Sequence, residues 1–281
     1  MKFWKMNGAG NDFLVLNNLE EHLPHEILPQ VARTLCHRHL SIGADGLMVV
    51  DTPTQGGDFK MLFFNSDGSL GEMCGNGARC ICRYGYENGL SGETQTVETT
   101  AGIVTGQRIT ERLYKIRLND VTTIRLNDSV EVDGVPYSCS YVELGNPGLP
   151  HAVVPYAGLQ QADTHELREL GRKLRWHSDF PKGANVNFYE LTDEDTLFER
   201  TFERGVEDFT YACGTGTGSV VAVLTLQGKV SGSSVRANMP GGQLVIDALR
   251  EGSVITDLYL TGPTNIVAKG EVTDEDLCLA K

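Results

Sequence analysis

Our interpretation of this chain starts from Glu72-Met73-Cys74-Gly75-Asn76-Gly77-Ala78-Arg79-Cys80, because its core pattern occurs again as Cys213-Gly214-Thr215-Gly216. Each copy leads into a run that favours a helix, so each cysteine is expected just before a helix start. The first turn of a helix has unpaired backbone N–H groups and the positive end of the helix dipole, which bind anions and favour thiolate over thiol. The sequence therefore predicts two reactive cysteines.

A single Cys-Gly-X-Gly segment is more often only a tight turn, whereas two copies favour catalysis. The two cysteines are 139 residues apart, about half the chain, which indicates a duplicated domain. If the halves face each other, a small acid held between them has one sulfur on each face of its reacting carbon. That geometry suits a racemase.

Composition limits the class of protein. The 281 residues are 40% hydrophobic and 22% charged, and the formal net charge of -13 argues against nucleic-acid and anionic-membrane partners. No apolar run is long enough to span a membrane, and Met1–Met6 lacks the apolar core of a signal peptide, so we expect a cytoplasmic enzyme. Seven cysteines argue against a disulfide framework, and Cys80 and Cys82 are expected as buried thiols, with no metal site.

Hydrophobic periodicity predicts one order of elements twice along the chain. The predicted helices are Ile27–Cys36, Gly77–Glu87, Thr164–Leu174 and Thr217–Leu226. The predicted strands are Phe3–Met6, Phe13–Leu16, Gly46–Val50, Phe59–Phe64, Gln95–Thr99, Tyr114–Leu118, Val121–Arg125, Val130–Val135, Cys139–Leu144, Val186–Tyr189, Leu197–Phe202, Ser234–Ala237, Gln243–Ile246 and Val254–Leu260.

Common signatures of other enzyme classes are absent from the sequence. Gly8-Ala9-Gly10 lacks the third glycine of a dinucleotide fingerprint, and the chain has neither a P-loop nor a Gly-X-Ser-X-Gly elbow. Nucleotide binding and serine-hydrolase chemistry are therefore disfavoured, and no cofactor is expected.

The sequence resembles the diaminopimelate epimerases along nearly its whole length. Besides the two cysteine segments, the resemblance rests on Gly8-Ala9-Gly10-Asn11-Asp12-Phe13, Phe64-Asn65-Ser66-Asp67-Gly68-Ser69, Asn185-Val186-Asn187-Phe188 and Glu203-Arg204-Gly205-Val206. It implies an α+β fold of two pseudo-symmetric domains, each a mixed β-sheet or barrel around a central helix. It places residues 1–118 with 262–281 in the lobe of Cys74 and residues 119–261 in the lobe of Cys213, and it implies a homodimer.

The resemblance also implies roles for single residues. Cys74 and Cys213 are the acid/base pair, and the backbone N–H groups of Gly75, Asn76, Gly214 and Thr215 bind the substrate α-carboxylate. The thiol pKa values are expected to be lowered towards working pH. The residues implied to hold the rest of an amino-acid substrate are Asn11, Asn65, Asn146, Asn185, Glu203 and Arg204.

Two of the implied roles, those of His151 and Arg204, have plainer alternatives. Glu203 is counted with the catalytic residues, and His151 is implied to support one thiolate, although a lone histidine is equally compatible with a buried structural role. The guanidinium of Arg204 suits a distal carboxylate, whereas a surface ion pair is the structural alternative.

The chain departs from the family near the expected far end of the substrate. It has Gly145-Asn146-Pro147-Gly148-Leu149-Pro150-His151 in place of a compact Gly-Asn-Pro-His, so either Leu149 or Asn146 occupies the position of the family asparagine. Phe209 and Tyr211 lie in a loop that is usually shorter and more polar. A racemase of another amino acid such as histidine is therefore an alternative. A non-catalytic amino-acid-binding protein is a second, while a phenazine-type isomerase would not use the cysteine pair.

Overall fold

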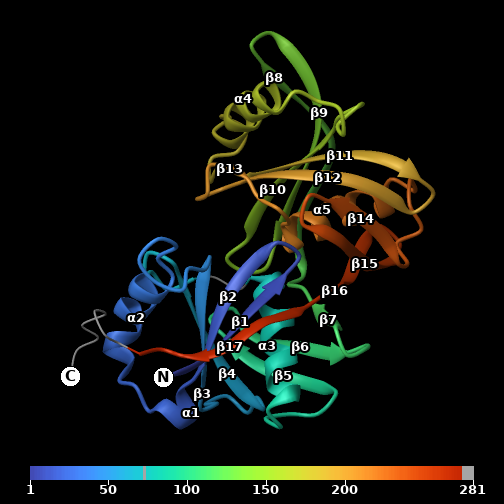
Figure 1. Cartoon of the computed structure of the whole chain (residues 1–281). Helices are drawn as coiled ribbons and strands as arrows, with labels where there is room; N and C mark the ends of the chain where they lie inside the picture. The colour runs from blue at the N-terminus through green and yellow to red at the C-terminus, as the bar shows by residue number, and fades with distance from the viewer. Residues whose placement is uncertain (72–73, 274–281) are drawn as a thin grey trace. The chain divides into compact units, whose positions relative to one another are not determined.

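The computed structural model describes residues 1–71 and 74–273, so Glu72, Met73 and Cys278 lie outside the described part. The chain divides into two compact units. Unit 1 comprises Met1–Ile116 and Gly262–Lys281, and unit 2 comprises Arg117–Thr261. Both are mixed α+β structures with much sheet and few helices, drawn from blue to red along the chain in Figure 1.

Unit 1 has two helices that connect parallel strands. Its strands are β1 (Lys2–Gly8), β2 (Asn11–Asn17), β3 (Gly46–Asp51), β4 (Phe59–Asn65), β5 (Thr94–Thr99), β6 (Gly102–Arg108), β7 (Leu113–Arg117) and β17 (Asn265–Glu271). Its helices are α1 (Asn18–Glu21), η1 (His25–Ile27), α2 (Leu28–Leu35) and α3 (Gly75–Glu87). The pairs β2/β3 and β4/β5 are parallel, and α2 and α3 cross between their respective strands.

Unit 2 contains the remaining elements. Its strands are β8 (Val121–Val132), β9 (Val135–Leu144), β10 (Leu149–Pro155), β11 (Asn185–Asp193), β12 (Thr196–Glu203), β13 (Asp208–Phe209), β14 (Val235–Met239), β15 (Gly242–Glu251) and β16 (Val254–Pro263). Its helices are α4 (Thr164–Arg175) and α5 (Gly214–Leu226). Here β10/β11 and β12/β14 are the parallel pairs, with α4 and α5 between them.

The same sequence of strand pairings occurs in both units. From β1 to β6 the successive pairs are antiparallel, parallel, antiparallel, parallel and antiparallel. From β9 to β15, with β13 set aside, they follow the identical order. The helix that follows the fourth strand of this series is α3 in unit 1 and α5 in unit 2. These two helices begin directly after Cys74 and Cys213.

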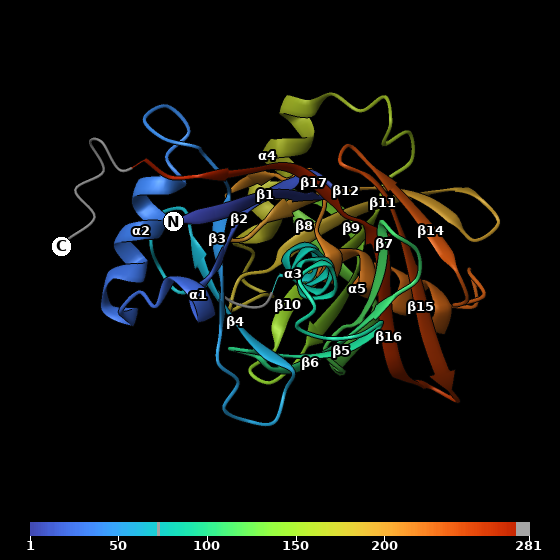
Figure 2. The same ribbon diagram turned by 60° about the horizontal axis from the view of Figure 1, so that its bottom comes forward.

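These two helices are the buried centres of their units. Residues 75–85 of α3 and 214–225 of α5 are all buried. A helix that is buried on every side needs its polar groups satisfied internally. In α5 the hydroxyls of Thr217, Ser219 and Thr225 do this by donating to carbonyls one turn earlier. Figure 2 looks almost along α3, which contacts β1, β2 and β6.

Each unit also has an outer helix that packs by one apolar face. In unit 1, Leu28, Val31 and Leu35 of α2 join a core with β2 and β3. In unit 2, Leu167 and Leu174 of α4 pack against strands β8 to β12. The Asp163 side chain caps α4 by accepting the backbone N–H groups of His165 and Glu166.

Several sequence predictions differ from the structure. The predicted helix starts at Gly77 and Thr217 are wrong, because α3 and α5 begin directly after Cys74 and Cys213. The predicted strand 130–135 is wrong because Asp133 and Gly134, both with positive φ, form a two-residue turn between β8 and β9. Strands β6, β10, β13 and β17 were not predicted. No helix within the described ranges is long and apolar enough to cross a membrane.

Candidate active site

Cys74 and Cys213 have the same backbone geometry. Each is the N-cap residue of its helix, with φ/ψ of -106°/119° at Cys74 and -122°/104° at Cys213. The carbonyl of Cys74 accepts the N–H of Ala78 at 2.8 Å, and that of Cys213 accepts the N–H of Thr217 at 2.9 Å. Each cysteine therefore precedes the first turn, where backbone N–H groups have no partner within the helix.

Glycine allows close packing around both helix starts. A Cβ at Gly216 would lie 2.2 Å from Oδ1 of Asn187, and a Cβ at Gly8 would lie 2.9 Å from the carbonyl oxygen of Asn76. Side chains at these positions would displace the strands that pack on α5 and α3. The predicted anion-binding residues Gly75, Asn76, Gly214 and Thr215 are the first two residues of each helix, and all four are buried.

In unit 1 the structure brings two of the predicted asparagines together. Nδ2 of Asn76 donates to Oδ1 of Asn11 at 2.5 Å, and Nδ2 of Asn11 donates to Asp45 at 3.1 Å. Asn65 lies at the same end of the sheet, because Gly46 pairs with Phe13 on one side and Asn65 on the other. Its exposed side chain donates to the Ser69 hydroxyl at 2.9 Å.

In unit 2, strand pairing and one hydrogen bond bring four predicted residues to the same end of the sheet. His151 of β10 is the partner of Asn185 in the parallel pair with β11. Oδ1 of Asn185 accepts the backbone N–H of Arg204 at 2.7 Å, and the Arg204 guanidinium donates to the Lys182 carbonyl at 3.3 Å. Glu203, half-buried, ends β12 beside them. This end of the sheet therefore combines an amide, a carboxylate and a guanidinium.

His151 is fully buried, and its Nδ1 lies 3.3 Å from Nδ2 of Asn187. Burial, reinforced by the positive charge of Arg204, lowers the pKa of His151 to about 3. The imidazole is therefore neutral at physiological pH and cannot supply a positive charge to a thiolate. Its Nε2 has no hydrogen-bond partner within the described residues.

The departures from the family pattern fall in a turn and in the core. Asn146 is exposed in the turn that joins β9 to β10, whereas Leu149 is half-buried and begins β10 opposite Leu144. No polar contact of the Asn146 side chain is present in the described part of the chain. Phe209 packs against Phe188 and Phe202, so it contributes to the unit 2 core. Tyr211 is 64% exposed.

The electrostatic surroundings of Cys213 differ from the prediction. Burial and the nearby Glu203 carboxylate raise the pKa of the Cys213 thiol well above its ordinary value. The Thr215 hydroxyl, 3.6 Å from Sγ, and the Gly216 N–H act in the opposite direction but do not balance them. The prediction of a lowered pKa is wrong for Cys213, whose thiol is protonated at neutral pH in this conformation.

Glu199 is a further buried acid near Cys213 that the sequence interpretation missed. It is 2% exposed, and burial raises its pKa to about 8. The Thr201 hydroxyl donates to Oε1 of Glu199 at 3.4 Å. The hydroxyls of Thr201 and Thr217 have nearer acceptors in Asn187 Oδ1, at 3.1 Å, and the Cys213 carbonyl, at 2.9 Å. Glu199 is therefore a neutral carboxylic acid at physiological pH. A charged residue at an inward-facing strand position was its only sequence signal.

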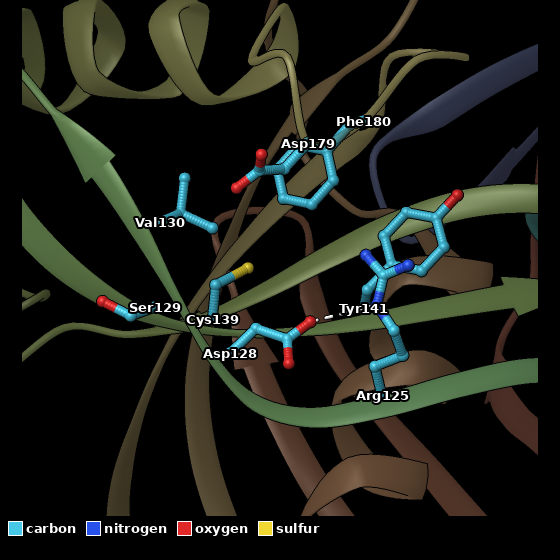
Figure 3. A pocket seen from close by; sticks show the side chains of 8 residues that line it. All are labelled: Arg125, Asp128, Ser129, Val130, Cys139, Tyr141, Asp179 and Phe180. Carbon is cyan, nitrogen blue, oxygen red and sulfur yellow. Dashed lines mark hydrogen bonds and ion pairs between the residues drawn. The ribbon is translucent and has the colours of Figure 1, made fainter.

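A pocket of about 400 Å³ in unit 2 contains none of the predicted site residues (Figure 3). The guanidinium of Arg125 lies over the Tyr141 ring at 4.6 Å and donates to Asp128 at 3.0 Å, which closes part of the hollow with an internal ion pair. The lining residues are Arg125, Asp128, Ser129, Val130, Cys139, Tyr141, Asp179 and Phe180. Within the described ranges, no group of three or more His, Cys, Asp or Glu side chains is arranged to hold a metal ion.

Comparison with known proteins identifies the family. The sequence model named diaminopimelate epimerase matches residues 3–113 and 144–267. The chain is 36% identical over 286 residues to the diaminopimelate epimerase of Aquifex aeolicus, covering 99% of both. It is 37% identical to that of Chlorobaculum tepidum, covering 95% of this chain and 100% of the other. The chain belongs to the diaminopimelate epimerase family. Membership of the diaminopimelate epimerase family makes it an isomerase.

Solved structures share the fold at low identity. A hydroxyproline epimerase from Agrobacterium vitis has a TM-score of 0.69 and 17% identity, covering 97% of this chain and 90% of that one. A PhzF-family phenazine biosynthesis protein from Enterococcus faecalis has a TM-score of 0.66 and 14% identity, covering 97% and 99%. In this diaminopimelate epimerase family member, six of the eight pocket residues lie in 114–143, between the two matched segments.

Proposed function

We propose that this protein is a cofactor-independent epimerase that interconverts LL- and meso-diaminopimelate, a reaction of lysine biosynthesis. The observation that carries the proposal is 36% identity to a diaminopimelate epimerase over 99% of both chains, with both Cys-Gly-X-Gly segments present. The matched N-cap geometry of Cys74 and Cys213 supports the reaction class.

The reaction proceeds by two proton transfers at the substrate α-carbon. One cysteine begins as a thiolate, removes the α-proton and becomes a thiol. The other begins as a thiol, gives its proton to the opposite face and becomes a thiolate. The reverse reaction exchanges the roles of Cys74 and Cys213. No electrons leave the substrate, so the chemistry is proton transfer alone.

The carbanion needs stabilisation because the α-proton of an amino acid is very weakly acidic. We assign this to backbone N–H groups of the first helix turns, at Gly75, Asn76, Gly214 and Thr215, which bind the α-carboxylate as it gains enediolate charge. The buried position of these residues supports the assignment. The substrate's amino groups and distal carboxylate are assigned to Asn11, Asn65, Asn185, Glu203 and Arg204.

Asn146 and His151 receive weaker roles in this proposal. The exposed position of Asn146 favours a contact with the far end of the substrate over one with the reacting carbon. The neutral, buried His151 supports Asn187 beneath α5 and does not exchange protons with a thiol.

Units 1 and 2 are proposed to be the two pseudo-symmetric domains of the family, each contributing one cysteine at a helix start. The repeated order of strand pairings supports this assignment. A homodimer and a cytoplasmic location complete the proposal.

The proposal is tested by incubating purified protein with LL-diaminopimelate in D₂O without added cofactor. We expect meso product that carries deuterium at the inverted α-carbon. Cys74→Ala and Cys213→Ala should each abolish most turnover, whereas Cys139→Ala, which alters a buried thiol of the unit 2 core, should retain it. Full turnover by the Cys213→Ala variant would refute the two-thiol mechanism.

A panel of L-amino acids tests the choice of substrate. L-Histidine is included because of the altered 145–151 and 203–213 segments. Inversion of L-histidine with inert LL-diaminopimelate would refute the proposed substrate while keeping the reaction class. Stoichiometric binding without deuterium exchange would instead indicate an amino-acid-binding protein.

A further inference from the structure

Arg79 is a buried cation of α3 whose side chain contacts the first turn of the same helix. Its side chain is 0% exposed. Nη1 donates to the carbonyl of Gly75 at 3.2 Å, and Nη2 donates to Oδ1 of Asn76 at 2.8 Å. Nε has no hydrogen-bond partner in the described part of the chain. Both acceptors belong to the two residues that directly follow Cys74.

A guanidinium enclosed in this way normally needs an anion, because removing a charge from water costs several kcal/mol. Arg83, one helical turn later, has ion pairs with Glu87 and Glu111. Arg79 has no carboxylate within ion-pair distance among the described residues. Within the described residues, the ionisable groups that act on it are the thiols of Cys80, Cys74 and Cys82, all from α3 or its N-cap.

Two of these three thiols are excluded as anions. Cys80 and Cys82 are fully buried, and burial raises the pKa of each to about 12. Both are therefore neutral at physiological pH. Cys74 is only half-buried and stands at the helix start, where the dipole also favours negative charge.

We propose that Arg79 is the buried counter-charge of the Cys74 thiolate and a positioning residue for the first turn of α3. The inference rests on the proposed function of Cys74 and adds the group that maintains its charge. The guanidinium acts through space and does not touch the substrate.

The Arg79 side chain is also the first member of a series of hydrogen-bonded polar side chains. Arg79 holds Asn76, whose amide donates to Asn11, and Asn11 in turn donates to Asp45. Asn76 and Asn11 are both assigned to substrate binding. Loss of Arg79 would therefore affect the charge at Cys74 and the orientation of these two amides.

The second cysteine has no arginine at the corresponding position of its helix. Five residues after Cys74 is Arg79, whereas five residues after Cys213 is Gly218. Burial and the Glu203 carboxylate act on Cys213, and both disfavour its thiolate. The two cysteines therefore have opposite electrostatic surroundings although their backbone geometry is the same.

The test measures the ionisation of Cys74 directly. Iodoacetamide reacts with thiolates, so the rate of alkylation at Cys74 as a function of pH gives the midpoint of its titration. The rate is followed by mass spectrometry of the peptide that contains Cys74, in the substrate-free full-length protein. We compare wild type with Arg79→Gln, Arg79→Lys and the control Arg83→Gln, a buried arginine of the same helix.

We expect a wild-type midpoint below the ordinary thiol pKa of about 8.5. Arg79→Gln should raise it by about one pH unit or more. Arg79→Lys should restore part of the shift, and Arg83→Gln should leave it at the wild-type value. With LL-diaminopimelate, kcat of Arg79→Gln should fall and the acidic limb of its pH profile should move to higher pH.

An unchanged midpoint in folded Arg79→Gln would overturn the proposal. If that variant fails to fold, the wild-type midpoint decides, and a value at or above about 8.5 overturns it. Alkylation needs no substrate, so this result is independent of the two-thiol mechanism. A negative alkylation result together with deuterium incorporation that requires both cysteines would reject the role of Arg79 alone.

Discussion

Oδ1 of Asn185 accepts the backbone N–H of Arg204 at 2.7 Å and thereby joins the first residue of β11 to the segment that follows β12. The contact fixes the backbone from which the Arg204 guanidinium extends. It also fixes the neighbouring Glu203, which acts electrostatically on Cys213. The buried Asn185 amide therefore positions Arg204 and Glu203, which we assign to substrate binding.

Replacing Asn185 by alanine should weaken substrate binding. The lost hydrogen bond leaves the Arg204 N–H unpaired, a cost of about 1–3 kcal/mol. We expect KM for LL-diaminopimelate to rise about tenfold or more, measured by steady-state kinetics. Asn238→Ala, which removes a contact with Gln243 at 2.9 Å on β14 and β15, is the control and should leave KM unchanged. Equal KM values in both variants would argue against a positioning role for Asn185.

Glu199 should make stability depend on pH. Its pKa is about 8 in the folded protein and 4.5 ordinarily, so the folded state binds more protons between these values. Stability is therefore highest at the acidic end and falls by about 1.4 kcal/mol per unit as pH rises through this window. Glu199→Gln keeps a neutral side chain of the same shape and should remove this slope.

The measurement is urea unfolding at pH 5, 6, 7 and 8 for wild type, Glu199→Gln and the exposed control Glu251→Gln. The advantage of the Gln variant over wild type should increase with pH. A difference that stays constant across the series would show that Glu199 is ionised in the folded protein.

Gly216 should not tolerate a side chain. A Cβ there would lie 2.2 Å from Oδ1 of Asn187, which must then move and weaken its contact with His151. We expect Gly216→Ala to lower the free energy of unfolding by about 1–3 kcal/mol and to reduce kcat. Gly92→Ala, where no atom lies within 4 Å of the added Cβ, is the control. A melting temperature equal to that of the control would contradict the predicted clash.

Mild oxidation should test whether the two sulfurs share a site. If Cys74 and Cys213 converge on one carbon, an oxidant should link them, inactivate the protein and be reversed by dithiothreitol. Peptide mapping under non-reducing conditions identifies the linked pair. Inactivation that maps to Cys36, which is buried in the unit 1 core, would count against a shared site.

The sequence predicted the central elements of the fold well because their signals are local. Two glycine-rich segments after cysteines identified α3 and α5, and apolar runs identified β3, β4 and β12. The predicted helix starts were late because Gly75 and Gly214 have low helix propensity, although both lie in the first turn. Propensity was outweighed there by the burial of the whole helix.

Other elements depend on contacts that a local pattern does not contain. Strand β17 is mostly exposed and has no alternation of buried and exposed positions, and it is a strand because it pairs with β1 over Lys2–Asn7. No sequence motif identified Asp45, because its contact with the site is a hydrogen bond from Asn11, which is 34 residues earlier. The prediction of a lowered pKa for Cys213 was wrong because it considered only the backbone N–H groups and dipole at the helix start. Burial of the thiol and the Glu203 carboxylate raise that pKa.

The position of β17 in the chain has a consequence for biosynthesis. Unit 1 is built from two segments separated by all of unit 2, and Lys2 pairs with Glu271. During translation the ribosome completes unit 2 before it makes the strand that covers β1. The edge of β1 that pairs with β17 therefore stays unpaired until Asn265–Glu271 has been synthesised. A pause or premature stop after residue 261 would leave a finished second unit attached to an unfinished first one that is prone to aggregation.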